Sequence, residues 1–452
     1  MINLTIFEYS LLGLFFLLLI LIGYLSSKKE SKEEYLIADR KLGVLSSVST
    51  IVASKVGGGL LVTCMALVYL YGISAIWLFF GFAFGYIIFY FFAIELKKLA
   101  DKERYYTLSD YFFNRFSKST GFLSAGILGI SYFFIFVVQL IAGAKLLSVL
   151  TGFSYIFSLL IITSIILFYL ILGGFKAVVK TDVIQYMAIL VIVFFVAVFL
   201  TFNFGFKFDP VQWDLFKAGP KIIIPFFLGG LLVPLASPEL WRRIYATKNL
   251  KTAKRSIIFA NIFYVLTGLV LVFIGLIIRQ NLPNIDPDLS LVLGFSNLLP
   301  TGFVGLGVIA LFAAIMSSAD TYIFTDVSIF AQDFYRRLKN PNKSQILKFI
   351  RVMLVFLALS GLILAYAIPS LAEIFFLYAG VVMLLSIMVI ATRVNKKVSS
   401  FSLMLGMIFG ILAMVIYGIF KGINPTMAFS LIIGGLFGLF LGEAWTITRS
   451  RL

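Results

Sequence analysis

Thirteen apolar segments dominate the sequence. Each is long enough to cross the hydrocarbon core of a membrane, which takes about 20 helical residues. A bilayer interior offers no water to satisfy free backbone groups, so such segments must be helices. The sequence therefore predicts an all-α polytopic membrane protein with thirteen transmembrane helices. We number them 0 to 12, near residues 6–26, 43–71, 73–96, 121–149, 153–173, 181–203, 222–241, 256–279, 302–332, 346–368, 370–392, 398–420 and 426–447.

The composition agrees with a membrane protein and excludes several classes of function. Hydrophobic residues make up 61% of the 452 residues and charged residues only 13%, unlike an ordinary soluble chain. The chain has no histidine and one cysteine, which removes the usual metal and proton-transfer ligand and any intrachain disulfide. We therefore expect no organic cofactor and no enzymatic activity.

The distribution of basic residues predicts the orientation. Thirty of the 37 lysines and arginines fall in alternate loops and at the C-terminus, and five fall in the remaining loops. Because basic loops stay cytoplasmic, the N-terminus is expected outside and the C-terminus inside. The net charge of +17 then reports topology and not nucleic-acid binding. We expect a multi-pass protein of the plasma (inner) membrane, functional as a monomer, whose partners are the lipid bilayer and a small solute.

The segment 43–71 contains a lysine and three consecutive glycines near its middle. Lys55 is twelve residues, about 18 Å, into this helix and close to the membrane midplane. A charge there costs about 2.5–3.5 kcal/mol, so it faces a cavity, a partner charge or a transport path. Gly57, Gly58 and Gly59 each weaken a helix by about 1 kcal/mol relative to alanine. We expect helix 1 to be broken here, with Gly59 as a hinge and freed carbonyls around a small cation. A glycine packing seam and a purely structural lysine are the alternatives.

Helix 6 carries a second interruption in the segment 222–241. Gly229, Gly230 and Pro234 are candidate hinges there, and proline removes a helical hydrogen-bond donor. Broken helices five apart are typical of inverted-repeat transporters with a site at the midplane. The predicted divisions are a leading helix 0 with the first cytoplasmic loop (1–42), helices 1–5 as the first repeat (43–205), helices 6–10 as the second repeat (206–392) and trailing helices 11–12 (393–452).

Helix 8 offers a stripe of small and hydroxyl side chains. Ala314, Ser317, Ser318 and Thr321 follow at i, i+3, i+4 and i+7 and so share one helical face. Opposite the carbonyls of a broken helix, they would form an oxygen-only site for a monovalent cation. Asp320 adds a carboxylate beside this face. Serines and threonines also serve as contacts between membrane helices, which is the alternative.

Five motifs together resemble the sodium:solute symporters, a family that includes proline, pantothenate, sugar, sialic acid and choline carriers. They are ASKVGGG in helix 1, YYTLSDYFFNRF (105–116), GGFKAVVKTDVIQ (173–185), SPELWRRIYATKNLKTAKRS (237–256) and AAIMSSADT in helix 8. The resemblance implies a LeuT-type fold of five plus five helices with one leading and two trailing helices. It also implies secondary active transport in which Na⁺ drives the uptake of a small organic solute by alternating access.

The resemblance also implies site residues. The principal sodium site would use the carbonyls of Ala53, Val56 and Ala314 and the hydroxyls of Ser317 and Ser318. A second cation or proton site, known in some members, would involve Asp182 with Ser317, Asp320 and Thr321. The candidates for solute binding and coupling are Lys55, Ser54, Gly57, Gly58, Trp77, Phe80, Tyr132 and Gln139.

Lys55 departs from the family pattern, which has acidic or neutral residues at this position. A cation there disfavours sodium unless a carboxylate compensates it, and Asp320 and Asp182 are the candidates. Lys55 could instead carry a coupling proton or bind the carboxylate of the solute. A carboxylate-bearing or zwitterionic solute is expected because the ammonium repels cationic ones. Proton-coupled or sodium-independent transport, and a sensor or uniporter on the same fold, remain the alternatives.

Overall fold

The computed structural model describes residues 5–26, 32–205, 207–368, 371–424 and 426–449. Within these ranges the chain is built of helices joined by turns and loops, with a single isolated β-bridge. The long helices are α1 (Ile6–Ser26), α5 (Ile76–Glu103), α7 (Lys118–Thr151), α8 (Tyr155–Phe204), α11 (Leu250–Asn281), α13 (Val304–Ile329), α15 (Lys343–Ala367), α16 (Leu371–Val394), α17 (Ser400–Lys421) and α18 (Met427–Arg449).

Shorter helices connect or extend the long ones. They are α2 (Lys32–Ile37), α3 (Val44–Lys55), α4 (Gly58–Tyr71), α6 (Ser109–Arg115), α9 (Pro220–Leu232), α10 (Pro238–Ala246), α12 (Ser290–Leu298) and α14 (Arg336–Lys339). Tighter 3-10 turns cover Ala38–Arg40, Gly72–Ala75, Val233–Ala236 and Pro287–Leu289, and a π-helical turn covers Phe330–Tyr335.

Each of the thirteen predicted segments is helical, but the structure does not confirm thirteen crossings. By length and composition, ten helices of the described residues could span a membrane, or eleven if the bent pair α9–α10 counts as one span. The predicted segments 153–173 and 181–203 run together as α8, which Gly174 interrupts at φ 51° and ψ −149°. A β-carbon there would lie 2.6 Å from the Tyr35 ring, so the position requires glycine.

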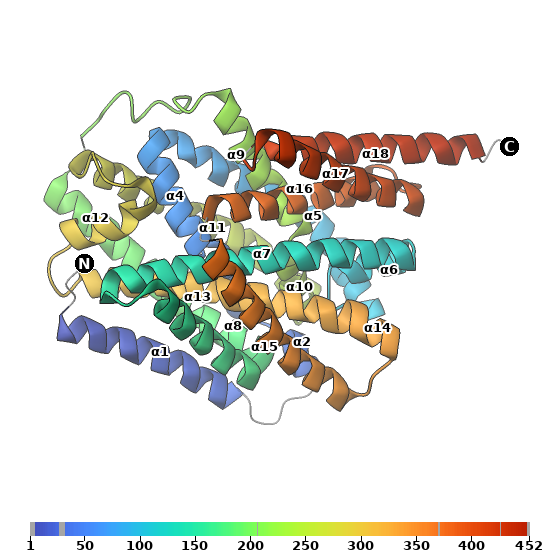
Figure 1. Cartoon of the computed structure of the whole chain (residues 1–452), viewed down its shortest axis with the longest axis horizontal. Helices are drawn as coiled ribbons and strands as arrows, with labels where there is room; N and C mark the ends of the chain where they lie inside the picture. The colour runs from blue at the N-terminus through green and yellow to red at the C-terminus, as the bar shows by residue number, and fades with distance from the viewer. Residues whose placement is uncertain (1–4, 27–31, 206, 369–370, 425, 450–452) are drawn as a thin grey trace.

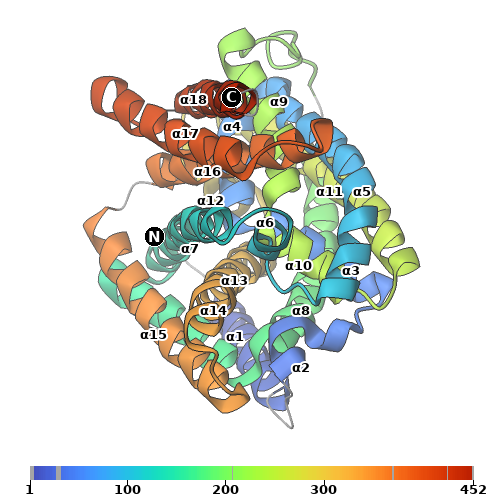
Figure 2. The same cartoon turned by 90° about the vertical axis from the view of Figure 1, so that its right-hand side faces the viewer.

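The helices form a bundle whose core lies along α13 and α7 (Figures 1 and 2). In their most apolar windows, 89% and 72% of residues are buried, against 22% for the peripheral α17. Figure 1 shows α12 at one end of the bundle and α6 and α14 at the other. We call these the α12 end and the α6 end. Asp110 joins α6 to α14 by ion pairs with Arg336 (3.3 Å) and Arg337 (2.5 Å). The orientation of the two ends in a membrane stays a prediction from loop charge.

Helix 1 is broken where the sequence predicted it. α3 ends at Lys55 and α4 begins at Gly58, while Val56 (ψ 34°) and Gly57 (ψ 173°) between them leave the helical conformation. Gly59 lies in the first turn of α4. The break therefore separates two helical arms at the depth of the lysine.

Helix 6 is also broken, but later than the glycines suggested. α9 continues to Leu232, and a 3-10 turn containing Pro234 precedes a bend of 43° into α10. The prediction that Gly229 and Gly230 interrupt the helix is wrong, because both lie inside α9. Gly230 instead permits close packing on α5, since a β-carbon there would lie 2.4 Å from the Leu78 carbonyl oxygen.

The isolated β-bridge joins the two broken helices at their far ends. The backbone N–H of Leu42, just before α3, donates to the Ala246 carbonyl (3.0 Å) at the end of α10. The N–H of Lys248 donates back to the Leu42 carbonyl (3.1 Å). The arms α3 and α10 are thus tied by backbone as well as by side chains.

Candidate cation and solute site

The break in helix 1 frees carbonyl groups that α13 then satisfies. Because α3 ends at Lys55, the carbonyls of Ala53 and Ser54 have no amide partner in the next turn. The hydroxyl of Ser317 donates to the Ala53 carbonyl at 3.1 Å, and that of Ser318 donates to the Ser54 carbonyl at 3.2 Å. The predicted face of helix 8 therefore meets the broken helix through oxygen atoms. We use the name oxygen cluster for the carbonyl groups of Ala53, Ser54 and Ala314 together with the hydroxyl groups of Ser317 and Ser318.

Glycine makes this approach possible. A β-carbon on Gly57 would lie 1.7 Å from the Ser318 hydroxyl oxygen and 3.3 Å from the Ala314 carbonyl oxygen. Ser317 Oγ also lies 3.0 Å from the Ala314 carbonyl oxygen, and Tyr322 donates to the Ser54 carbonyl at 3.1 Å. Predicted ligand groups from both helices are thus brought together.

The chemistry of the oxygen cluster fits a sodium ion. Its groups are uncharged carbonyls and hydroxyls, the ligand type that hard cations prefer. They also lie at the C-terminal end of α3, where the helix dipole is negative. Val56, the remaining predicted ligand, is buried at the break itself. The residues present can therefore hold a small monovalent cation.

Lys55 points away from the oxygen cluster, toward α10. Its ammonium forms an ion pair with Glu239 and a 2.8 Å hydrogen bond to the Ser237 hydroxyl oxygen. Lys55 is 7% exposed and Glu239 fully buried. Tyr132 of α7 donates to the second carboxylate oxygen of Glu239. The lysine is therefore neutralised by the other broken helix, and the carboxylate is shared with α7.

The prediction that Asp320 or Asp182 compensates Lys55 is wrong, because each has other partners. Asp182 lies 3.0 Å from the Arg243 guanidinium and accepts a hydrogen bond from Thr50. It is fully buried. Asp320 accepts a 2.9 Å hydrogen bond from Tyr169.

A guanidinium occupies the place predicted for a second cation. Arg243 Nη2 donates both to Asp182 (3.0 Å) and to the Thr321 hydroxyl (2.7 Å), and Nε donates to Thr50 Oγ1 at 2.7 Å. Arg243 is 1% exposed, although it is one of the thirty basic residues that the loop count placed on the cytoplasmic side. Asp182 and Asp320 each retain one buried carboxylate oxygen with no hydrogen-bond partner among the described residues.

The four aromatic and amide side chains predicted to line one pocket fall into two groups. Tyr132 packs against Tyr322 and Tyr378, with ring centroids 5.8 and 5.6 Å apart. Gln139 is buried on the same face of α7, two turns away. The Trp77 indole donates to a loop carbonyl and contacts Phe80, Phe216 and Phe227 in a different aromatic group.

Glu239 and Arg243 are the site residues that sequence reasoning missed. They are four residues apart on α10, so they share a face, and that face turns inward. The signal was present, because two charges at this spacing adjoined a segment already predicted to be broken. Counting Arg243 as a cytoplasmic loop charge concealed it.

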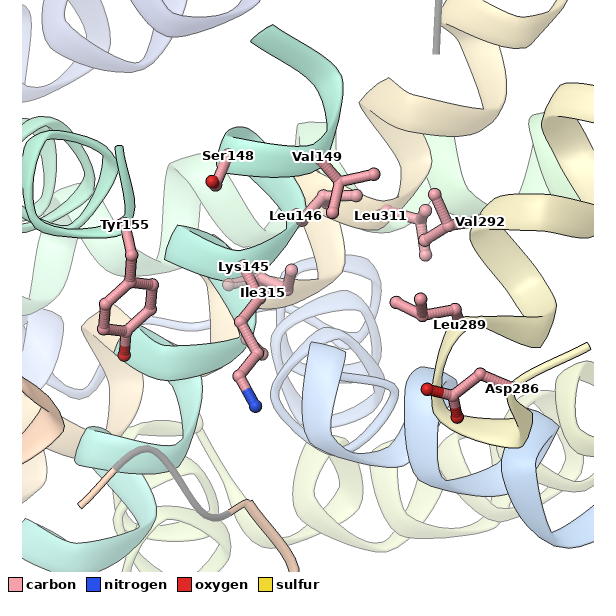
Figure 3. A pocket seen from close by; sticks show the side chains of 11 residues that line it. Lys145, Leu146, Ser148, Val149, Tyr155, Asp286, Leu289, Val292, Leu311 and Ile315 are labelled. Atoms are coloured by element: carbon pink, nitrogen blue, oxygen red, sulfur yellow. The ribbon is translucent and has the colours of Figure 1, made fainter. Parts of the chain in front are cut away.

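A cavity of about 400 Å³ lies at the α12 end (Figure 3). Its walls come from α7, the start of α8, the segment from Asp286 into α12, and the first half of α13. Figure 3 shows the Lys145 ammonium and the Asp286 carboxylate on different walls. The lining residues are Ala142, Lys145, Leu146, Ser148, Val149, Tyr155, Asp286, Leu289, Val292, Leu311 and Ile315.

Solved structures share this fold. The chain matches a Na⁺-coupled sialic acid symporter, solved substrate-bound and outward-open, with a TM-score of 0.85 and 19% identity, covering 100% of this chain and 99% of that one. It matches a nucleobase-cation-symport-1 family transporter, solved in a closed conformation, with a TM-score of 0.66 and 12% identity over 92% and 95% of the two chains. At these identities the likeness concerns the fold alone.

Curated sequences are closer. The osmoregulated proline transporter OpuE of Bacillus subtilis is 27% identical, covering 72% of this chain and 70% of its own length. Sodium/proline symporter 2 of Staphylococcus saprophyticus is 25% identical over 96% of this chain and 89% of its own. The model of the sodium:solute symporter family matches residues 35–410. The chain belongs to the sodium:solute symporter family.

Proposed function

We propose that this protein is a sodium-driven symporter of a small zwitterionic or carboxylate-bearing solute in the plasma membrane. Its family and relatives make it a cation-coupled transporter of a small solute, and not an enzyme. The observation that carries sodium coupling is the oxygen cluster, where one hydroxyl of α13 meets carbonyls of both α3 and α13. The proposed ligands are the carbonyls of Ala53, Val56 and Ala314 and the hydroxyls of Ser317 and Ser318.

The position of Lys55 supports sodium over a coupling proton. An unpaired ammonium beside the oxygen cluster would oppose a cation through Coulomb repulsion. Here the ammonium is paired with Glu239 and directed at α10, while the carbonyls of α3 face α13. The pair is neutral as a whole. A sodium ion at the oxygen cluster therefore meets no uncompensated charge from the lysine.

The second predicted cation site suggests that one sodium ion accompanies each solute. Arg243 already supplies a positive charge between Asp182 and Thr321, at distances typical of charge-assisted hydrogen bonds. A further cation would have to displace the guanidinium or share its carboxylate. We infer a resident cation at that position and a transported one at the oxygen cluster. Flux measurements that give two sodium ions per solute would contradict this.

The arrangement also supports alternating access. Tyr132, Ser317 and Ser318 belong to α7 and α13, and they bind groups of α3 and α10. We infer that these contacts close the path toward the α6 end, which the loop charges predict to be cytoplasmic. Release of solute to that side requires α3 and α10 to move away from α7 and α13. A cation bound across α3 and α13 would hold them together until release.

The solute class rests on charge and on the relatives. Proline, carried by relatives according to their names, is a small zwitterion. The paired charges of Lys55 and Glu239 next to a tyrosine cluster offer both signs to such a molecule. L-Proline is therefore the first solute to test.

The test is uptake into proteoliposomes under an imposed sodium or proton gradient. The panel includes L-proline, other amino acids, short carboxylates, sugars and choline. We expect sodium to drive uptake of a zwitterion or carboxylate, and the double variant Ser317→Ala/Ser318→Ala to lose that dependence. Uptake that follows the proton gradient and ignores sodium would overturn the proposed coupling. Choline as the preferred solute would overturn the proposed solute class.

A further inference from the structure

The cavity beside α12 and the central site lie along the same faces of two helices. On α13, Leu311 and Ile315 line the cavity, and Ser318 and Tyr322 follow on the same face at i+7 and i+11 from Leu311. Ile315 and Ser318 are three residues apart, about 4.5 Å along the axis. The cavity floor is therefore within about one helical turn of the oxygen cluster.

The facing helix α7 shows the same continuity. Leu146 and Ala142 line the cavity, and Gln139, Ile135 and Tyr132 continue the stripe at intervals of three and four residues. All three of the latter are buried, and the last reaches Glu239. The helices are in contact at the level of the floor, where a β-carbon on Gly143 would lie 3.3 Å from Ile315. The cavity thus ends where the packed stripe to the central site begins.

The chemistry of the walls suits a small zwitterion. A volume of about 400 Å³ lies in the range of about 300–1,000 Å³ that holds small ligands. Most lining side chains are apolar, whereas the charged ones are a lysine on α7 and an aspartate before α12. A molecule with a carboxylate, an ammonium and a compact apolar part matches all three features. A sugar has neither charge, and choline has no carboxylate for the lysine.

We propose that this cavity is an entry site that binds the solute before it reaches the central site, with Lys145 recognising its carboxylate and Asp286 its ammonium group. The inference rests on the proposed function, since it names an earlier binding step for the same solute. The central ion pair of Lys55 and Glu239 lies beyond the closed stripe. Binding in the cavity would therefore precede any rearrangement of α3 and α10.

The first experiment is site-directed labelling in intact cells that express the full chain. Cys64 is the only cysteine in the sequence, so Cys64→Ser gives a cysteine-free background. Ser148→Cys places a thiol in the cavity wall, and Thr301→Cys places one on the same end but outside it. A membrane-impermeant thiol reagent should label both. L-Proline at millimolar concentration should slow labelling at Ser148→Cys about tenfold and leave Thr301→Cys unchanged.

The second experiment measures uptake kinetics of L-proline. Lys145→Gln and Asp286→Asn should each raise KM about tenfold, which corresponds to about 1.4 kcal/mol of binding, with kcat and the sodium dependence retained. Lys221→Gln, an exposed lysine outside the cavity, is the matched control and should match wild type. L-Prolinamide lacks the carboxylate, so its KM should be the same in Lys145→Gln as in wild type.

The outcomes separate the entry site from the proposed function. Sodium-driven proline uptake without protection at Ser148→Cys, and with wild-type KM in both charge variants, would overturn the entry site and leave the function standing. If Thr301→Cys is not labelled from outside, the α12 end does not face the outside, and the cavity cannot be an entry site. Equal protection by choline would also overturn it, because the cavity would then not select for a carboxylate. The absence of uptake of any panel solute would instead contradict the proposed function itself.

Discussion

Separating Lys55 from Glu239 should be more harmful than removing both charges. Both side chains are almost completely buried and in direct ionic contact. Removing one partner of such a pair leaves a buried charge unmatched, at a cost of about 3–5 kcal/mol. Replacing both by neutral groups removes that penalty, so the net change is expected near zero or within about 1–2 kcal/mol. The variants are Lys55→Met, Glu239→Gln and the two together.

The assay is thermal unfolding of the purified protein in one detergent at one pH. We expect both single variants to melt below wild type and the double variant to melt above both singles. Lys41→Met is the control, because Lys41 is 79% exposed in its pair with Asp39 and such surface pairs contribute about 0–1 kcal/mol. A double variant that melts lower than either single would refute the reasoning, since the two losses would then be independent.

Transport by the same variants distinguishes the roles considered for Lys55. If the pair serves to neutralise charge, the double variant should keep its sodium dependence and its solute affinity. Loss of affinity with sodium dependence retained would indicate that the lysine holds the solute. Loss of a response to a pH gradient would indicate a proton carrier.

Ser317→Ala and Ser318→Ala should each raise the sodium concentration for half-maximal uptake, because each removes one ligand oxygen. Thermal unfolding should show that both variants remain folded. Unchanged sodium dependence in the double variant would exclude the oxygen cluster as the cation site. Gly57→Ala should abolish uptake, since its methyl group would lie 1.7 Å from the Ser318 hydroxyl, whereas Gly126→Ala, with open space around it, should behave as wild type. Asp320→Asn should reduce uptake strongly because that carboxylate adjoins the Arg243 group; uptake like wild type would contradict a functional role.

The broken helices and the serine face of helix 8 could be predicted because each rests on local chemistry. Three adjacent glycines disfavour a helix wherever they occur, and residues four apart share a face in any helix. The structure confirms the break at Gly57 and the contact of Ser317 with Ala53, both of which follow from these local rules. Glycine pairs are less specific, as Gly230 shows by serving helix packing inside α9.

The charge pairs could not be predicted because they depend on which distant helices meet. Lys55 and Glu239 are 184 positions apart, and nothing local distinguishes Glu239 from Asp320 as the partner. Arg243 illustrates a second difficulty. A basic residue at a helix end is usually cytoplasmic, and only the packing of α10 against α3 and α13 buries this one.

The β-bridge at Leu42 and Thr247 has a mechanical consequence. Two backbone hydrogen bonds couple the arms α3 and α10 at their outermost points, while the Lys55–Glu239 pair couples them near the breaks. Contacts at two separate points restrict rotation of α3 against α10, so the two arms should move as one rigid body about the breaks. Alanine scanning would not detect these backbone hydrogen bonds, because every residue except proline supplies the same amide N–H. Lys248→Pro would remove one of the two backbone donors and let α3 and α10 move independently.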